Sequence, residues 1–402
     1  MFMKRFNEIL MKKSLVFVLA LCILLGLSSG SRMKAQSGDL AAVNAAVDRL
    51  FKQSRTVGAS LVIMKNGAIL FRRDYGMRNV HQKLPVDENT YFRVSSVTKM
   101  VSAIAILQQV EAGLLDLDKD ISEYFGYQIA NPYFRRIPLT LRQLMSHTSS
   151  VSEDGGYSSI RSTVSQMLSR KSNRQSNYLD AAPGSRYVYS NYGAGLAGSC
   201  AEAVTDQSFN RTLTDGVFKP LGIDASLAAS WLLSPDDIAS VYENGTLKRA
   251  AAKYLNEPYE DTASPETHYR TSVGGLFIRA SDLALLANAL CGVGQVNGVR
   301  LLEEKTVHIM REQQHTLGES VSGESPYGLF LERNTLLLPE HTVFGHQGMN
   351  NGASSNVYFE PESGFVFVLT TNGCSQVRAH GTIVLAKNLL RYTYPLFSGS
   401  VL

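Results

Sequence analysis

The chain has 402 residues, of which 44% are hydrophobic and 18% are charged, enough for one large domain or two subdomains with a substantial core. It contains 39 basic and 35 acidic residues. The first 35 residues hold six of the basic residues and one of the acidic ones, so the rest of the chain has 33 basic and 34 acidic residues. The net charge of +4 therefore comes from the N-terminal segment, and the charge balance argues against a nucleic-acid or anionic-membrane partner.

Residues 1–35 have the pattern of a secretory signal. Basic residues precede the apolar run Leu15–Leu27, which is too short to span a bilayer comfortably, and Ser28–Gly30 or Ala35–Gln36 offers a cleavage site. We expect a secreted or periplasmic protein. The alternatives are a short uncleaved anchor and lipid attachment at Cys22, and these are the only routes to membrane association that we expect.

Three cysteines, Cys200, Cys291 and Cys374, remain after that segment. They are too few and too scattered for a disulfide framework, and no C-x-x-C pair indicates zinc. At most one pair could form a bridge, and each is better interpreted as a small buried side chain.

Hydrophobic periodicity places strands near both ends of the chain and helices in the middle. The predicted helices cover 39–51, a long stretch after Ser96, 140–148, 191–205, 282–290 and 382–391, while the predicted hairpins pair 59–64 with 68–73 and 355–359 with 365–370. A polar loop covers 149–184, and the region 226–266 carries no motif beyond turns.

This order predicts an α/β (α+β) fold with one antiparallel sheet built from both termini and flanked by helices. Residues 36–96 and 266–402 would form the α/β subdomain, and 97–265 an inserted all-α subdomain. We expect a site in the cleft between the two, where ligands commonly bind.

Ser96-Val97-Thr98-Lys99 stands where a small-residue turn enters the long helix. Ser96 and Lys99 would lie on the same face, one turn apart. A serine hydroxyl needs a neighbouring base, and a lysine can be that base if burial lowers its pKa. The pattern is weak alone, because Ser31-Arg32-Met33-Lys34 repeats it.

Two further segments carry polar groups suited to catalysis. Tyr189-Ser190-Asn191 begins a helix; Tyr189 could exchange protons if Lys99 lowers its pKa, and Asn191 could bind a substrate amide. Phe344–Gly352 offers His346 for a substrate carbonyl and a backbone N–H after Gly348 for an oxyanion hole. The alternatives are a capped helix start with a packing tyrosine, and a glycine-rich turn with an exposed histidine.

Other catalytic patterns are absent from the sequence. His147-Thr148-Ser149 is better interpreted as local hydrogen bonding than as part of a triad, and the mature chain has no G-x-S-x-G. The histidines are dispersed, and the acids at 116, 118 and 120 lack the glycine and distal glutamate of a calcium loop. We therefore expect no metal and no cofactor, and turn or cap roles for these acids.

The ordered motifs resemble the serine β-lactamase and penicillin-binding-protein superfamily, in its class C β-lactamase-like branch. The resemblance covers nearly all of residues 40–392. It rests on the S-x-x-K, Y-x-N and H-x-G segments and on Tyr75-Gly76, Leu141–Ser149, Pro183-Gly184, Gly274-Gly275-Leu276 and Ser281-Asp282-Leu283.

By that resemblance Ser96 is the acylated nucleophile, Lys99 its proton acceptor and Tyr189 the general acid and base. The resemblance further implies that Asn191 binds the substrate amide, that His346 and Gly348 lie on the strand edge beside the acyl group, and that Met349 N–H completes the oxyanion hole with Ser96.

Two departures from the family pattern stand out. The third motif of true class C β-lactamases is K-T-G, and here it is His346-Gln347-Gly348. A mostly neutral histidine is a weaker partner for the β-lactam carboxylate than lysine. The family's H-T-S-G is His147-Thr148-Ser149-Ser150.

We therefore predict a monomeric serine hydrolase that acts through an acyl-enzyme on esters, or on D-amino-acid or cell-wall peptides. One alternative is a penicillin-binding or sensor protein that acylates without turnover. The other is a true class C-type β-lactamase.

Overall fold

The computed structural model describes residues 40–154, 157, 162–172, 175–314 and 327–399. The predicted signal segment with Cys22 lies outside these residues, as do parts of the 149–184 loop. The predicted first helix is present at 40–53. One unit of the chain ends at Leu50 and a second, compact unit begins at Phe51; the description below concerns the second unit.

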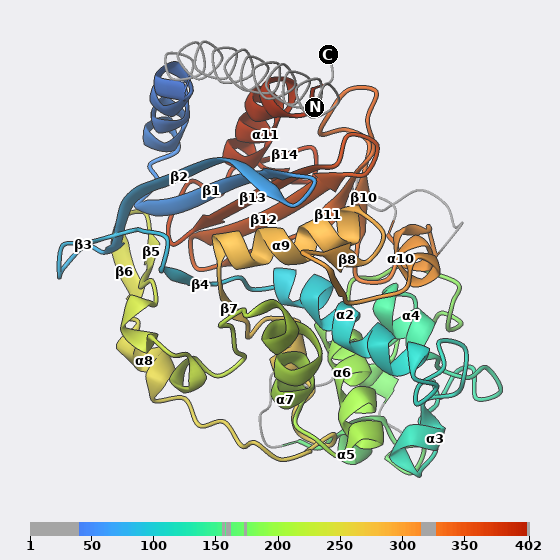
Figure 1. Ribbon diagram of the computed structural model, residues 1–402. Helices are drawn as coiled ribbons and strands as arrows, with labels where there is room; N and C mark the ends of the chain where they lie inside the picture. The colour runs from blue at the N-terminus through green and yellow to red at the C-terminus, as the bar shows by residue number, and fades with distance from the viewer. Residues whose placement is uncertain (1–39, 155–156, 158–161, 173–174, 315–326, 400–402) are drawn as a thin grey trace, which may run out of the picture. The chain divides into compact units, whose positions relative to one another are not determined.

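Both ends of the second unit contribute to one antiparallel sheet, as predicted (Figure 1). Within the described residues it has seven strands in the order β10-β11-β12-β13-β1-β2-β3. The junction between N- and C-terminal strands is the β1–β13 pair, in which Leu61 lies opposite Leu369. The bounds are β1 Gly58–Lys65, β2 Ala68–Asn79, β3 Leu84–Pro85, β10 Glu332–Asn334, β11 Val343–Asn350, β12 Ala353–Glu360 and β13 Phe365–Thr371.

The first hairpin is defined by its turn. Asn66 and Gly67 have φ values of 49° and 81°, the left-handed geometry that a two-residue hairpin loop requires. An Asn-Gly pair adopts this geometry at little cost, which is why the sequence signal was reliable here.

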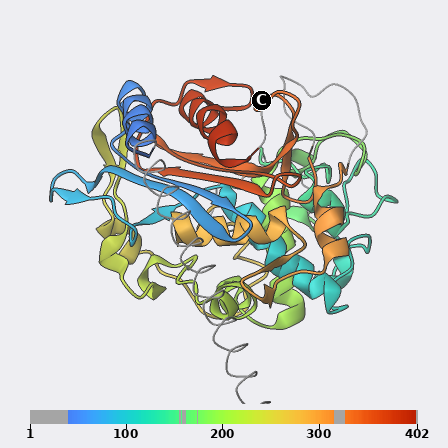
Figure 2. The same ribbon diagram turned by 45° about the horizontal axis from the view of Figure 1, so that its top comes forward.

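Helices cover both faces of the sheet. Figures 1 and 2 show α11 (Val384–Phe397) on one face, and α9 (Ala280–Cys291) with α2 (Val97–Glu111) on the other. The remaining helices are α3 Ser122–Phe125, α4 Leu141–Met145, α5 Val164–Leu168, α6 Asn191–Thr205, α7 Phe209–Leu213, α8 Ala252–Leu255 and α10 Glu304–Arg311.

Short strand pairs complete the described structure. They are β4 Tyr91–Arg93 with β7 Phe277–Arg279, β5 Val241–Glu243 with β6 Thr246–Arg249, β8 Gln295–Val296 with β9 Val299–Arg300, and β14 Arg378–Ala379 with β15 Thr382–Ile383. The β4–β7 pair matters most for the site, because β4 leads directly into the turn before α2.

The core lies between the sheet and the helices and includes α2, whose residues Val97–Leu107 are all buried. Cys200, Cys291 and Cys374 are buried and free, as single small side chains. Among the described residues, none of the helices has the length and apolar character needed to cross a membrane.

Candidate active site

A strained turn presents Ser96 at the start of α2. Ser95 has a φ of 51°, which is uncommon for a residue other than glycine, and the backbone N–H of Val94 donates to Leu276 O at 2.9 Å. Ser96 is partly exposed while Ser95 and Val97 on either side of it are buried. The helix N-terminus contributes a positive field at its hydroxyl.

Lys99 is fully buried one turn into α2, and its ammonium group has three neighbours. Its Nζ lies 3.2 Å from Ser96 Oγ, 2.7 Å from Asn191 Oδ1 and 3.0 Å from the carbonyl oxygen of Val273. The two carbonyl oxygens can only accept hydrogen bonds. A neutral amine that donates to both therefore directs its lone pair toward the Ser96 hydroxyl.

Burial also makes the neutral form of Lys99 accessible. Desolvation lowers the pKa of Lys99 to about 7, opposed by the negative charge of Glu153. Desolvation and the nearby lysine also lower the pKa of His147 and of His346, so both rings are neutral.

Tyr189 contacts both Lys99 and Ser96 and immediately precedes Ser190, the N-cap of α6. Ser190 caps this helix by accepting the N–H of Gly193 at 2.9 Å, and Lys99 Nζ lies 5.0 Å from the Tyr189 ring centroid. Burial raises the pKa of Tyr189 above its ordinary value, although a hydrogen bond with Ser96 opposes this. The phenol therefore stays protonated, and the condition considered from the sequence, a Tyr189 pKa lowered by Lys99, is not met.

His346 is buried in β11, not exposed in a turn. Its Nδ1 lies 2.7 Å from Gln347 O, and its Nε2 lies 2.7 Å from Tyr327 Oη. Because a carbonyl oxygen only accepts, Nδ1 carries the proton and Nε2 accepts from the phenol. Desolvation, with Lys99 nearby, lowers the pKa of His346 to about 3, so this ring supplies no positive charge.

Gly348 brings β11 against the nucleophile turn. A Cβ added at this position would lie 2.3 Å from Val94 O and 2.8 Å from Ser96 N, both backbone atoms that cannot move aside. The next residue, Met349, is 41% exposed and lines the cavity described below. The close approach places this strand beside the Ser96 N–H, where the oxyanion hole was predicted.

Replacing Gly348 with Ala should therefore displace β11 from the turn. We expect the thermal midpoint to fall, with a stability loss of about 1–3 kcal/mol from overpacking. We also expect kcat/KM for an ester substrate to fall by about 10²-fold, since one oxyanion donor contributes roughly this much. Thermal melts and steady-state kinetics measure both effects, and full activity at an unchanged midpoint would contradict the proposed packing.

A cavity of about 630 Å³ opens at Ser96. Of the predicted site residues, Ser96, Tyr189, His346 and Met349 line it, whereas Lys99, Asn191 and Gly348 do not. The lining residues are Ser96, Tyr187, Tyr189, Tyr327, Glu332, Asn334, His346, Gln347, Met349, Arg378, Ala379, His380 and Gly381.

Sequence reasoning missed Tyr327 and Glu153, and it gave His147 a local role only. Tyr327 donates to His346, and Glu153 acts on Lys99 by its charge. His147 was interpreted as a local hydrogen-bonding residue, and its Nδ1 does accept the N–H of Ser190 at 3.2 Å. The centroid of its ring also lies 4.3 Å from that of Tyr189, so it packs against a residue that lines the cavity.

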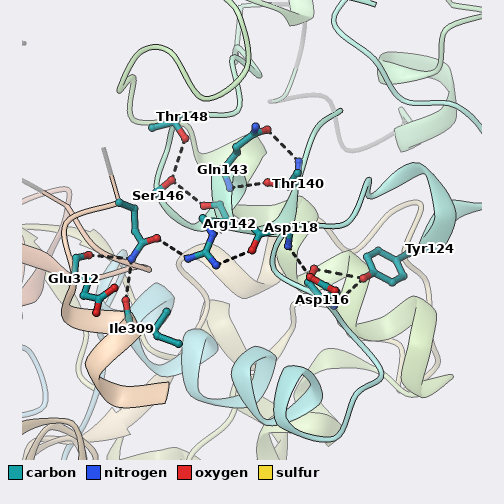
Figure 3. A network of polar contacts seen from close by, with 11 residues as sticks. Asp116, Asp118, Tyr124, Thr140, Arg142, Gln143, Ser146, Thr148, Ile309 and Glu312 are labelled. Atoms are coloured by element: carbon teal, nitrogen blue, oxygen red, sulfur yellow. Dashed lines mark hydrogen bonds and ion pairs between the residues drawn. The ribbon is translucent and has the colours of Figure 1, made fainter. Parts of the chain in front are cut away.

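A polar network holds the segment that carries His147 (Figure 3). Arg142 Nε donates to Asp118 Oδ1 at 2.7 Å, and its Nη1 donates to Gln314 Oε1 at 2.8 Å. Ser146 Oγ donates to Arg142 O at 2.8 Å, and the next residue, His147, has a φ of 57°. Asp118 thus forms an ion pair with Arg142 instead of the turn or cap role that was expected, whereas Asp116 Oδ1 accepts the N–H of Asp118 at 2.8 Å, as in a turn.

Among the described residues, one group outside the cavity has ligand atoms close enough for a metal. His341, Glu360 and Glu362 place these atoms within 4.8 Å of one another. The Glu360 carboxylate, however, accepts the N–H groups of Glu362 and Ser363 at 2.9 and 2.8 Å. These bonds cap the β12–β13 turn, and they account for the position of the Glu360 carboxylate without an ion.

The family model described as Beta-lactamase matches residues 43–386. The chain belongs to the Beta-lactamase family. The family assignment agrees with the resemblance seen in the ordered motifs and with the mixed α/β fold.

Curated relatives match part of the chain, and two of them illustrate the likeness. The esterase EstB of Burkholderia gladioli is 29% identical over 225 residues, 51% of this chain and 55% of its own length. Protein flp of Staphylococcus aureus (strain MRSA252) is 27% identical over 187 residues, 44% of this chain and 36% of its own length. The matched part thus spans about a third to a half of these relatives.

Solved structures of the same fold cover most of the chain. The D-amino acid amidase of Ochrobactrum anthropi SV3 has a TM-score of 0.69 at 21% identity, covering 90% of this chain and 100% of its own. The D-alanine carboxypeptidase AmpC of Burkholderia cenocepacia has a TM-score of 0.64 at 20% identity, covering 89% and 98%. At these identities the likeness establishes the fold.

Proposed function

We propose that the chain is a serine hydrolase that cleaves ester or amide bonds through an acyl-enzyme on Ser96. One observation carries this proposal. The buried amine of Lys99 lies 3.2 Å from Ser96 Oγ, and its other two neighbours are acceptors only. A base held in this way can remove the serine proton as the hydroxyl attacks a carbonyl carbon.

The protonated Tyr189 has a complementary role in this proposal. Its hydroxyl is hydrogen-bonded to Ser96, so it can donate a proton to the leaving group while Lys99 holds the one taken from the serine. The Ser96 and Met349 N–H groups would stabilise the oxyanion. Water then attacks the acyl group on Ser96 and releases the acid. Asn191 would donate a hydrogen bond from its amide nitrogen to the substrate.

Esters and D-amino-acid or cell-wall peptides are the proposed substrates, ahead of β-lactams. The relatives named as esterase, amidase and carboxypeptidase support this order. So does the neutral His346, which stands where class C β-lactamases have a cation for the β-lactam carboxylate. We further propose that the protein is secreted after removal of residues 1–35.

The rate should depend on the protonation of Lys99. Because only the neutral amine accepts a proton, kcat/KM should rise as pH increases through about 7 and level off above it. This rising part of the profile is its acid limb. His147 and His346 have lowered pKa values, so their titration should not contribute to the acid limb. The pH–rate profile of p-nitrophenyl ester hydrolysis measures it, and a flat profile across this range would contradict a base with the Lys99 pKa.

A substrate panel tests the function itself. The full chain is assayed on p-nitrophenyl esters, D-Ala peptides and nitrocefin beside the Ser96→Ala variant. We expect turnover of an ester or D-peptide that the variant lacks, and slower turnover of nitrocefin. Absence of turnover on every substrate, together with a lasting penicillin adduct by intact mass, would favour the sensor that acylates and stalls.

A further inference from the structure

Glu153 lies on a short turn, and the backbone just before it is held by two hydrogen bonds. Leu179 N donates to Ser150 O, and Ser152 N donates to Asn177 O, each at 2.8 Å. These two bonds hold Ser150 and Ser152 against the 177–179 segment and so position the backbone that leads into Glu153.

That carboxylate is joined to Lys99 through one residue. Glu153 Oε1 accepts the backbone N–H of Asn191, the first residue of α6. The side chain of the same asparagine accepts from Lys99 Nζ at 2.7 Å. Glu153 thus holds the residue that orients the lysine, and its negative charge lies near the lysine's positive one.

We infer that Glu153 is a positioning residue that fixes Asn191 against Lys99 and sets the pH range in which Lys99 acts as a base. The inference rests on the proposed function, in which Lys99 accepts the serine proton. It goes beyond that function because it assigns the control of the base to a residue outside the three motifs.

The surroundings of Lys99 leave Glu153 as its main charged partner. His147 and His346 face the lysine from the 147 turn and from β11, and both are neutral. Tyr189 is a protonated phenol. Among the described residues, Glu153 is the charged group that acts on the pKa of Lys99, with an effect opposite to that of burial.

Replacing Glu153 with Gln tests the effect of the negative charge separately from that of the hydrogen bond to Asn191. Glutamine keeps an oxygen that can accept the Asn191 N–H but loses the charge that favours protonated Lys99. The acid limb of kcat/KM should therefore move to lower pH by about one unit, as expected when an opposite charge nearby is removed. Below the wild-type limb the variant should be faster than wild type, and on the plateau it should be slightly slower, because an amine with a lower pKa is a weaker general base.

Asp154→Asn is the matched control, because it removes one negative charge from the neighbouring residue of the same turn. Its limb should coincide with that of wild type. Glu153→Ala removes charge and acceptor together, so it should shift the limb and also lower the plateau rate. Thermal melts of all three variants show whether they are folded.

The outcomes separate the inference from the proposed function. An unmoved limb in a folded Glu153→Gln variant, or an equal fall in rate at every pH, would overturn the inference while Ser96 remains the nucleophile. Retained activity in Ser96→Ala would overturn the proposed function instead. A shift of the same size in Asp154→Asn would also contradict a specific role for Glu153.

Discussion

Replacing Ser96 with Ala should lower kcat/KM for p-nitrophenyl ester hydrolysis by about 10⁴-fold or more, because no nucleophile remains to be acylated. Ser96 is the partly exposed hydroxyl at the cavity, and alanine fills its place without a clash. The fold should be unaffected, so the thermal midpoint should stay near that of wild type. Steady-state kinetics and a thermal melt measure the two quantities.

Ser102→Ala is the control for that variant. Ser102 lies on the same helix, and its hydroxyl donates to Ser272 O at 2.7 Å, away from the cavity lining. Its loss should cost about 1 kcal/mol of stability and leave the ester rate close to wild type. An equal loss of activity in both variants would indicate damage to α2 and would not identify the nucleophile.

Replacing Lys99 with Met should lower kcat/KM by about 10³-fold, within the range of a lost general base. Methionine is apolar and of similar length, so it occupies the buried space but cannot accept the serine proton. Asn191 Oδ1 and Val273 O lose their donor, while the cost of burying a charged amine disappears. The pH–rate profile of the residual activity should lose its limb near 7.

Lys99→Arg distinguishes basicity from charge. Arginine keeps a positive charge and hydrogen-bond donors but stays protonated at every accessible pH, so it cannot act as the base. We expect the same loss of activity as in the methionine variant, provided that the thermal midpoint shows a folded protein. Recovery of the rate with arginine would mean that Lys99 acts only through its charge.

Much of this fold was readable from local signals. The Asn66–Gly67 turn, the alternating strands and the buried α2 are specified within a few residues of sequence, and the structure contains them. The sheet that joins both termini was expected because strands lay only at the two ends. The order of the motifs was the signal for the family, since each motif alone was weak.

The parts that could not be predicted depend on contacts between distant segments. Glu153 meets Asn191 across 38 residues of sequence, and Tyr327 meets His346 from a segment that carried no motif. Burial also sets the pKa of a side chain, and the spacing of residues along the sequence does not reveal how buried a side chain is. A lysine near Tyr189 suggested a lowered pKa, whereas the enclosed position of the phenol raises it.

The most direct test of the account is the site of acylation. The wild-type chain is mixed with p-nitrophenyl acetate, quenched in acid within one turnover, digested and analysed by tandem mass spectrometry. The account predicts one acetyl group per chain, located on Ser96 and absent from Ser96→Ala. An acetyl group on another residue that accumulates at the rate of turnover, or full turnover by Ser96→Ala, would contradict it.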